Sequence, residues 1–422
     1  MDLPTSSDVD HAAARIAGVV TRTPLQHSAR LSSLLGLEVW LKREDLQPVR
    51  SYKLRGAYNL IEQLSDEARA RGVTCASAGN HAQGVALACA RAGVQARVHL
   101  PRTTPRQKRE RIKVLGGRYV EIVIVGDSYD DAAAASAAYA EATGATPVPA
   151  FDDPRTIAGQ GTVAREVLEQ LGREPDAVVV PVGGGGLLAG MVTYLADRAP
   201  GVRVIGAEPA AAACMAAALA AGEPVELDAA GLDGFVDGAA VRRSGDWTFE
   251  VVQQVKPELV AVPEGLVAVE MLDLYQSDGI IAEPAGALAS ATLRLSEADG
   301  GVHLEPASTV VVIVSGGNND VSRYAEVVER ALVYEGLKHY FLVEFPQEPG
   351  ALRRFLDEVL GPDDDITLFE YVKRSNRETG PALVGIELQH AADLAGLLAR
   401  MERSPIRFET VDADSPLFRF VQ

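Results

Sequence analysis

The sequence predicts an α/β fold, in which a parallel sheet carries helices on both faces, followed by a smaller α+β module of the ferredoxin-like kind. Short apolar, β-branched runs alternate with helical patterns up to about residue 330, and this alternation is typical of βαβ units. The composition then shifts, and the last segments follow the order strand-helix-strand-strand-helix-strand. A chain of 422 residues is long enough for two or three domains, and we expect domains at 1–330 and 336–422.

The composition is that of a soluble globular protein and argues against several kinds of partner. A formal net charge of −18 opposes binding to nucleic acid or to an anionic membrane. Cys75, Cys89 and Cys214 lack the spacing of a metal site, so we expect free thiols and a cytoplasmic location. Residues 1–15 contain acids and no apolar core, unlike a signal peptide. Residues 177–195 are uncharged and long enough to suggest a membrane span, but a proline and a run of four glycines inside them predict a strand, a turn and a helix instead.

Each element of the first region is predicted from its periodicity and its boundary residues. Ser6, Ser7 and Asp8 precede a helical pattern and are expected to cap it. Residues 232–245 lack periodicity and are expected to form a loop. Strands are expected at 37–41, 74–76, 96–100, 119–125, 178–182, 202–208 and 309–314. Helices are expected at 81–88, 105–115, 130–143, 156–171 and 264–277. Further helices are expected directly after Lys53, Gly186 and Glu283 and around Met215.

The tail is expected to form a second, smaller domain. It has no clustered nucleophile or base, so a regulatory or assembly role is favoured over a second catalytic one. Its expected elements are a strand at 339–345, a helix at 350–360, strands at 367–373 and 382–389, a helix at 391–402 and a strand at 407–411.

Four consecutive glycines (183–186) join an apolar strand to a small-residue helix. Glycines let the backbone turn sharply and let its N–H groups converge, and the helix start adds its dipole. The pattern therefore predicts an anion site, most often for phosphate. A plain tight turn is disfavoured, because each glycine costs about 0.5–1 kcal/mol relative to alanine. Residues 184–189 also fit the dinucleotide pattern G-x-G-x-x-A, and Glu208 ends the next strand where it could bind a ribose.

Other polar groups follow the ends of predicted strands. Lys53 opens a helix, where the dipole disfavours its charged form, although a surface lysine is the plainer interpretation. Ser77, Asn80 and the turn amides suit a carboxylate, and capping is the alternative. His81 alone is more often structural than catalytic, and Ser315 ends an apolar strand at another glycine turn, where capping is again the alternative. Ligands of open α/β sheets bind outside the carboxyl ends of the strands, so this shared placement favours one site.

With these residues in view, the chain resembles the pyridoxal-phosphate enzymes of the tryptophan-synthase β fold, and among them the biosynthetic threonine dehydratases. The resemblance covers about residues 10 to 330 and implies two open, mostly parallel sheets, with a small subdomain at about 46–149 inserted in a larger one at 1–45 and 150–330. The tail resembles the single ACT-like domain of the short biosynthetic form, where the turn at 348–352 (Glu-Pro-Gly-Ala-Leu) would line an amino-acid effector site. The motifs are Lys-Arg-Glu-Asp-Leu-Gln-Pro at 42–48, Ser-Tyr-Lys-Leu-Arg-Gly-Ala at 51–57, Ser-Ala-Gly-Asn-His-Ala-Gln-Gly at 77–84, Phe-Asp-Asp-Pro at 151–154, Ala-Gly-Gln-Gly-Thr at 158–162, Pro-Val-Gly-Gly-Gly-Gly at 181–186, Glu-Pro-Ala-Gly-Ala at 283–287 and Ser-Gly-Gly-Asn at 315–318.

The resemblance implies an activity and a role for each candidate residue. The enzyme would deaminate L-threonine, or L-serine, to a 2-oxo acid and ammonia. With threonine the product is 2-oxobutanoate, in the first committed step of isoleucine biosynthesis, with isoleucine as allosteric inhibitor and a homotetramer as the assembly. Lys53 would carry pyridoxal 5′-phosphate as an imine and, as a neutral amine in a dry site, would take the α-proton. The other implied roles are phosphate binding by Gly183, Gly184, Gly185, Gly186 and Leu187, ring-oxygen binding by Asn80, ring-nitrogen binding by Ser315, and substrate-carboxylate binding by Ser77, Gly79, Asn80 and His81.

Three positions depart from related patterns. Serine racemases resemble this chain but carry a serine at the position of Ala78, so we expect no racemisation. They also bind a divalent cation through an acid where this chain has Cys214, so no divalent metal is expected, while a monovalent ion stays open. Tyr52 replaces the phenylalanine common before the family lysine, which is a mild change.

Two other functions stay open on the sequence alone. A dinucleotide-dependent enzyme would use residues 184–189 and Glu208, but it needs no Lys53 and leaves the motifs at 51–57 and 315–318 unexplained. A non-catalytic amino-acid sensor built on the tail would bind isoleucine without releasing ammonia from threonine. Threonine and serine both stay open as substrates, because one methyl group is worth only about 1–3 kcal/mol in a pocket.

Overall fold

The protein is described by a computed structural model at residues 2–371 and 378–411. Its internal contacts divide the chain into two units, Met1–Asp320 and Val321–Gln422. Each unit has hydrophobic core residues of its own.

The larger sheet of the first unit has six strands. They are β1 (Leu25–His27), β2 (Glu38–Arg43), β7 (Ala177–Pro181), β8 (Arg203–Pro209), β9 (Glu258–Val262) and β10 (Thr309–Val314). Their order is β1-β2-β10-β7-β8-β9, with only β1 antiparallel to its neighbour. Strands β7 and β10 are buried along their whole length and, apart from Thr309, apolar, as expected for parallel strands covered on both faces.

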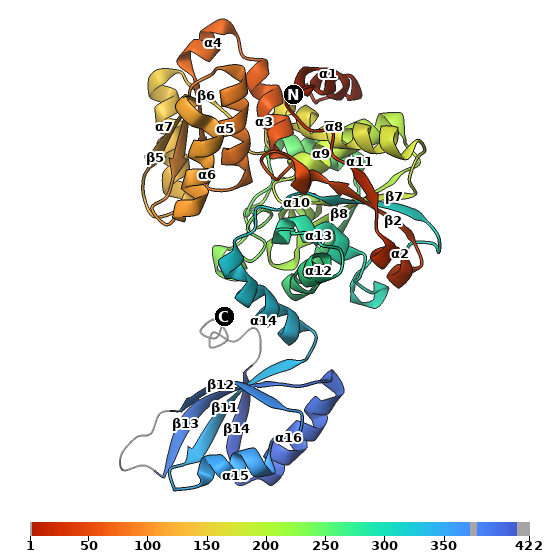
Figure 1. The fold of residues 1–422 in the computed structure, drawn as a ribbon. Helices are drawn as coiled ribbons and strands as arrows, with labels where there is room; N and C mark the ends of the chain where they lie inside the picture. Colours follow the sequence, from red (N-terminus) through yellow and green to blue (C-terminus); the bar gives the residue numbers. More distant parts are fainter. Residues whose placement is uncertain (1, 372–377, 412–422) are drawn as a thin grey trace. The chain divides into compact units, whose positions relative to one another are not determined.

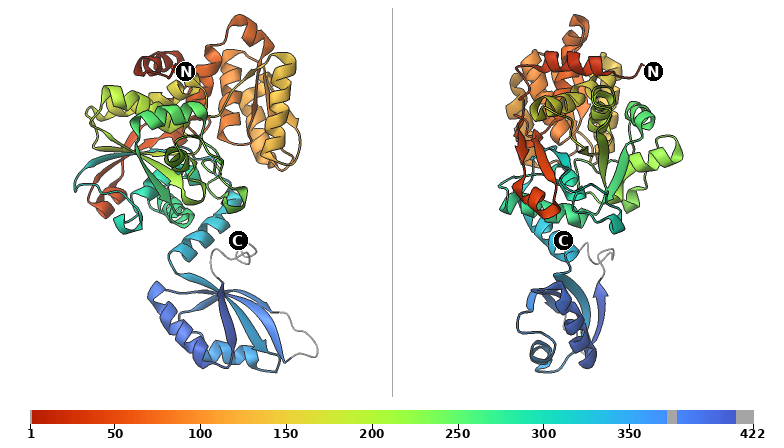
Figure 2. Two further views of the ribbon diagram at one scale, coloured as in Figure 1. Left: turned by 180° about the vertical axis from the view of Figure 1, so that it is seen from behind. Right: turned by 90° about the vertical axis from the view of Figure 1, so that its right-hand side faces the viewer.

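Helices cover both sides of this sheet. They include α8 (Pro154–Leu171), α9 (Gly186–Arg198), α12 (Glu264–Gln276) and α13 (Pro284–Thr292). Both Figure 1 and the left view of Figure 2 show α8 and α9 on one side and α12 and α13 on the other. Val178 and Val180 of β7 and Val311 and Ile313 of β10 lie in one core cluster with residues of α8 and α9.

The smaller sheet has four parallel strands in the order β5-β4-β3-β6. Its strands are β3 (Val73–Ala76), β4 (Ala96–Leu100), β5 (Val120–Ile124) and β6 (Thr146–Pro147). Helices α5 (Asn80–Ala92), α6 (Arg106–Gly116) and α7 (Tyr129–Thr143) pack against it. The expected pair of open parallel sheets with flanking helices is therefore confirmed.

Helix α3 (Lys53–Glu62) joins the layers of the two sheets, because it packs against α5 on one side and against α8 on the other. Its crossing with α8 is close: a Cβ added at Gly159 would lie 2.6 Å from the Cα of Gly56. Small residues at the crossing let the two helix backbones approach. The first turn of α3, which begins with Lys53, therefore lies between the two sheets (Figure 1).

Some predicted elements need correction. Helix α1 (Ser6–Ile16) is capped by Thr5, not by Ser6, Ser7 or Asp8, because the Thr5 side chain accepts from the Asp8 amide while the Asp8 carboxylate accepts from the Thr5 amide. Helix α11 (Asp246–Val255) and β9 have no counterpart among the predicted elements. Both follow the aperiodic segment 232–245, and β9 is an edge strand with partly exposed residues. Short elements that were likewise not expected are β1, β6, α2 (Ala29–Leu35) and α4 (Asp66–Arg71).

The second unit begins with α14 (Tyr324–Tyr334), which was not expected, and continues with the predicted ferredoxin-like order. Its further elements are β11 (Lys338–Pro346), α15 (Ala351–Glu358), β12 (Asp365–Tyr371), β13 (Thr379–Glu387), α16 (Leu394–Arg403) and β14 (Arg407–Val411). The four strands form an antiparallel sheet in the order β12-β13-β11-β14, and α15 and α16 pack on it through Phe355, Leu397 and Met401.

Parts of the expected tail lie outside the described residues, namely Val372 and Lys373 of the predicted strand 367–373 and residues 412–422 of the expected domain. Helix α16 starts later than expected, because Ala391–Asp393 form a separate 3₁₀ turn. Within the described part of the chain, every helix is too short or too polar to cross a bilayer.

Candidate active site

A cavity of about 1090 Å³ opens between the two sheets of the first unit. It receives residues from α3, from the turns after β3 and β7, and from the segment 237–243. Ten of the eleven predicted site residues line it, namely Lys53, Ser77, Gly79, Asn80, His81, Gly183, Gly184, Gly185, Gly186 and Leu187. Ser315 is the predicted residue that does not line it.

The glycine turn after β7 can be formed only by residues without side chains. Gly185 has a φ of +93°, which side chains disfavour. A Cβ added at Gly184 would lie 2.4 Å from the ring of Phe151, and one at Gly186 would lie 2.7 Å from the Phe151 Cβ. Helix α9 starts directly after the turn and has no side-chain cap, so its first N–H groups are available to an anion. This backbone fits a phosphate group.

Lys53 points its amine into the same cavity. It is the first residue of α3 and is half-buried, and its Nζ donates to the carbonyl oxygen of Ala150 over 3.1 Å. The ring of Tyr52 lies beneath this amine, with 5.1 Å between Nζ and the ring centroid. An amine held by one neutral acceptor beside an anion site is suited to a carbonyl-bearing phosphate ester such as pyridoxal phosphate.

The turn after β3 leads into α5 at Asn80. Gly79 is the N-cap and no side chain caps the helix, so capping does not account for Ser77 or Asn80; the Ser77 hydroxyl instead accepts from the Gly79 amide over 3.2 Å. His81 is buried, and its Nε2 donates to the Val148 carbonyl over 2.7 Å. Burial, and then the charge of Lys53, lowers the pKa of His81 to about 4, so this imidazole is neutral at neutral pH. The open N–H groups of α5 fit a carboxylate.

Two residues that the sequence marks only as members of motifs, Glu283 and Asn318, contact Asn80. The Asn80 Nδ2 donates to Glu283 Oε1 over 2.5 Å, and the Asn318 Nδ2 donates to Asn80 Oδ1 over 2.7 Å. Both Glu283 and Asn318 line the cavity. Burial and the charge of Asp237 raise the pKa of Glu283 to about 7. In the sequence, only their positions after predicted strands or turns could have indicated a role in the site. Their contacts with Asn80 join distant segments, which a local pattern does not reveal.

Ser315 lies at the end of β10, as predicted, and is buried. Its hydroxyl donates to the carbonyl oxygen of Ala285 over 3.0 Å, and its own carbonyl accepts from the Tyr52 amide over 3.1 Å. The second contact joins Ser315 to the residue before Lys53. Its predicted contact with a ring nitrogen stays a prediction.

Glu208, which the dinucleotide hypothesis requires, does not line the cavity. Its carboxyl oxygens accept from the amides of Met215 and Ala216 over 2.7 and 2.9 Å at the start of α10 (Cys214–Ala221). Burial raises its pKa to about 7. A buried acid engaged by two amides is not available to bind a ribose, which weighs against that hypothesis.

Cys214 is also buried, with its thiol 3.5 Å from the carbonyl oxygen of Gly183. Among the residues that the structure describes, no three His, Cys, Asp or Glu side chains are grouped so that they could hold a metal ion. Ala78 lines the cavity beside Ser77.

The chain is similar to known proteins in both of its units. A family model described as pyridoxal-phosphate dependent enzyme matches residues 16–316, and one described as C-terminal regulatory domain of threonine dehydratase matches residues 329–421. A Mycobacterium tuberculosis protein named L-threonine dehydratase biosynthetic is 63% identical, over 99% of this chain and 96% of its own. The structure of threonine deaminase isoform 2 from Solanum lycopersicum matches with a TM-score of 0.71 and 38% identity, over 78% of this chain and 95% of that one. Maize serine racemase matches with a TM-score of 0.71 and 32% identity, over 78% and 98% of the two chains.

Proposed function

Since this chain belongs to the biosynthetic L-threonine dehydratases, which are pyridoxal-phosphate-dependent enzymes, we propose that it deaminates L-threonine to 2-oxobutanoate and ammonia. The reaction would be the first committed step of isoleucine biosynthesis. L-serine, which lacks only the methyl group, is the second candidate substrate.

The observation that supports this most strongly is the meeting of two distant segments at one cavity. The amine of Lys53 and the glycine turn at 183–186 line the same space, and each is suited to one end of pyridoxal phosphate. The turn and the start of α9 would hold the phosphate. Asn80 would bind the ring oxygen, and the ring nitrogen would lie toward Ser315, which adjoins the cavity through its contact with the lining residue Tyr52.

The substrate would be held by the start of α5. Its carboxylate would accept from Ser77 and from the amides of Gly79, Asn80 and His81, where the helix dipole favours negative charge. The His81 imidazole is neutral at neutral pH and so adds no charge to this carboxylate site. A substrate held there would have its α-carbon in the cavity that Lys53 also lines.

Pyridoxal phosphate, when bound, withdraws electrons from the α-carbon and so makes its proton acidic. Lys53 would take that proton with its free amine, and the carbonyl of Ala150 lies within reach to hold the amine in place. The β-hydroxyl would then leave as water after taking up a proton, and hydrolysis of the resulting enamine by water would give 2-oxobutanoate and ammonia.

For the second unit we propose regulation by isoleucine, bound at the turn 348–352. This proposal is supported by the match of residues 329–421 to a regulatory domain and by the turn geometry, in which Gly350 has a φ of +88° at the start of α15. A homotetramer is proposed as the assembly, and the cytoplasm as its location.

One experiment separates this function from its rivals. The purified protein should bind pyridoxal phosphate with a yellow colour that borohydride bleaches, and mass spectrometry should then locate the added mass on Lys53. Ammonia release should be measured with L-threonine and L-serine, each with and without isoleucine. Lys53→Ala should lose both the borohydride-stable mass and the turnover.

Each rival has its own outcome. Full turnover and the same colour in Lys53→Ala would refute the assignment. Binding of a nicotinamide dinucleotide in place of pyridoxal phosphate would support the dinucleotide enzyme. Binding of isoleucine without ammonia release would support the amino-acid sensor.

A further inference from the structure

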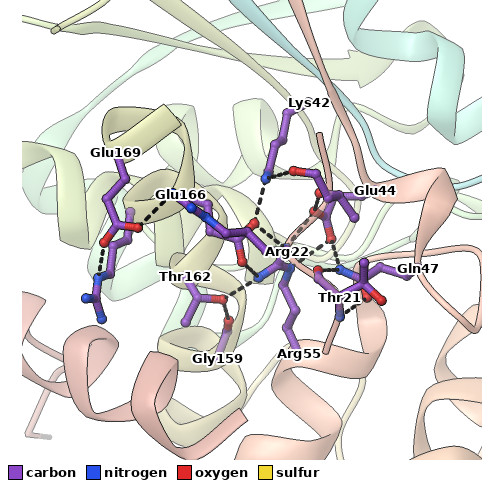
Figure 3. Close-up of polar contacts among 12 residues, drawn as sticks. Thr21, Arg22, Lys42, Glu44, Gln47, Arg55, Gly159, Thr162, Glu166 and Glu169 are labelled. Atoms are coloured by element: carbon purple, nitrogen blue, oxygen red, sulfur yellow. Dashed lines mark hydrogen bonds and ion pairs between the residues drawn. The ribbon is translucent and has the colours of Figure 1, made fainter. Parts of the chain in front are cut away.

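A buried cluster of four charged residues lies behind the first turn of α3, on the side away from the cavity. Lys42 and Arg55 have fully buried side chains, as does Glu44, and Glu166 is 15% exposed. The two cations and two carboxylates balance in charge. The four residues belong to four elements, namely β2, the 3₁₀ turn after it, α3 and α8, and Figure 3 shows them converging, with Thr162 at the edge of the group.

Arg55 is the centre of this cluster. Its Nε and Nη2 donate to the two carboxylate oxygens of Glu44 over 2.8 and 2.7 Å. Its Nη1 and Nη2 donate to the two oxygens of Glu166 over 2.7 and 2.9 Å, and Nη1 also reaches the Thr162 hydroxyl over 3.1 Å. All five N–H groups of the guanidinium can thus be used. Two paired carboxylates define the position of its plane.

Lys42 completes the cluster. Its Nζ donates to Glu166 over 2.5 Å, to the Gln170 side chain over 2.9 Å and to the Thr23 carbonyl over 2.7 Å. Three partners match the three hydrogens of an ammonium group. Thr162, Glu166 and Gln170 follow one another at four-residue spacing, so one face of α8 supplies these contacts.

The cluster joins the large sheet to α3. Lys42 lies one residue before the end of β2 and Glu44 begins the 3₁₀ turn after that strand, while Glu166 belongs to α8. Burial alone would lower the pKa of Arg55, but the two carboxylates outweigh it and raise that pKa. Burial likewise works against the charge of Glu44, yet Arg55 lowers its pKa. Arg55 and Glu44 therefore stay charged in the interior, while burial lowers the pKa of Lys42.

Lys53 and Arg55 lie on opposite sides of the same helical turn. Two residues along an α-helix correspond to a rotation of about 200°, so a side chain held at Arg55 directs the one at Lys53 the other way. Lys53 faces the cavity, whereas Arg55 is not among the cavity residues. Lys53 has a single described hydrogen bond, to Ala150, so its position depends on the backbone that carries it.

We propose that Arg55, held by Glu44 and Glu166, is a positioning residue that sets where the Lys53 amine lies in the cavity. The proposal deepens the proposed function and rests on it. A displacement of about 1 Å of a reacting group can cost about 100-fold in rate. Loosening the first turn of α3 should therefore reduce turnover without any change in the cavity wall.

The test compares full-length Arg55→Lys and Glu166→Gln with a matched control, Arg30→Lys. Arg30 also pairs with a buried carboxylate, Glu270, over 2.6 Å and with Asp278 over 2.8 Å, but none of the three lines the cavity. For each variant and the parent, the measurements are pyridoxal-phosphate affinity, kcat and KM for L-threonine, the pH profile of kcat and the thermal unfolding temperature. Glu166→Gln keeps an acceptor for Arg55 and so serves as the milder variant if Arg55→Lys does not fold.

Arg55→Lys is expected to lower kcat at least tenfold with KM changed less than threefold, to weaken pyridoxal-phosphate binding and to shift the pH profile of kcat. Glu166→Gln should act in the same direction to a smaller extent. Arg30→Lys should lower the unfolding temperature while kcat stays within twofold. The proposal is overturned if the folded cluster variants keep kcat and cofactor affinity within twofold of the parent. If the parent itself does not deaminate threonine, the proposed function fails, and cofactor affinity alone then decides the role of the cluster.

Discussion

Asn318 orients the side chain of Asn80. The Asn318 Nδ2 donates to the carbonyl oxygen of Val49 over 2.7 Å and to Asn80 Oδ1 over 2.7 Å. A carbonyl oxygen can only accept, so the Val49 contact identifies the nitrogen of Asn318. The oxygen of Asn80 must then face Asn318, and its nitrogen faces Glu283 at 2.5 Å. Asn80 therefore presents a donor on the side of Glu283.

Asn318→Asp should weaken pyridoxal-phosphate binding at least tenfold. An aspartate cannot donate to Val49 or to Asn80, so the amide of Asn80 loses its defined orientation. The measurement is an absorbance titration of the cofactor-free protein with pyridoxal phosphate. Asn319→Asp is the matched control, because it adds the same charge to the cavity wall but changes a residue that donates to Ala282. Equal losses in both variants would attribute the effect to charge rather than orientation.

Gly184→Ala should abolish tight binding of pyridoxal phosphate while the protein still folds. The added Cβ would lie 2.4 Å from the Phe151 ring, so either the ring or the turn must move and the N–H groups no longer converge. Gly201→Ala is the control, since a Cβ there meets only Glu174 at 3.5 Å. Cofactor titration measures the affinity of both variants, and thermal unfolding checks that both are folded. Unchanged affinity in Gly184→Ala would contradict a phosphate site at this turn.

The stability of the protein should depend on pH through Glu208. Burial raises its pKa from 4.5 to about 7 in the folded protein, so between these values the folded state holds a proton that the unfolded state has lost. Its contribution to stability is therefore complete below about pH 4.5 and decreases as the pH rises toward 7, by about 3 kcal/mol in all.

Glu208→Gln removes this titration, so the free energy of unfolding of the variant minus that of the parent should rise between pH 4.5 and 7. Urea unfolding at several pH values measures it. The neighbouring thiol of Cys214, whose pKa burial raises to about 12, stays neutral throughout this range. A difference independent of pH would show that Glu208 is already ionised in the folded protein.

Inhibition by isoleucine should require the second unit. A chain ending at Asp320, where the first unit ends, should keep L-threonine turnover and lose inhibition. Full-length Gly350→Val tests the same site without a truncation, because valine strongly disfavours the φ of +88° found there. We expect this variant to need at least tenfold more isoleucine for half-inhibition, at unchanged kcat. Inhibition that survives in the truncated chain would place the effector in the first unit.

Much of the fold could be predicted from the chain because strand and helix periodicities are local. Strands β4, β10 and β14 have the predicted bounds. The ferredoxin-like order of the tail follows from the order of its segments. Local patterns were insufficient where a loop precedes an element, as for α11, or where a neighbouring side chain competes for a cap, as for Thr5 at α1.

By itself, the sequence determined which residues could serve a phosphate, an amine and a carboxylate, because glycine turns, a lysine and helix starts carry that chemistry locally. Only the tertiary structure decided how they are held. Glu283 and Asn318 reach Asn80 from 203 and 238 positions away, and Arg55 meets Glu166 across 111. The hydrogen bonds of Glu208, which keep it from a ligand, likewise depend on where the next helix begins. Such contacts arise from the packing of distant segments, and no local pattern of residues encodes them.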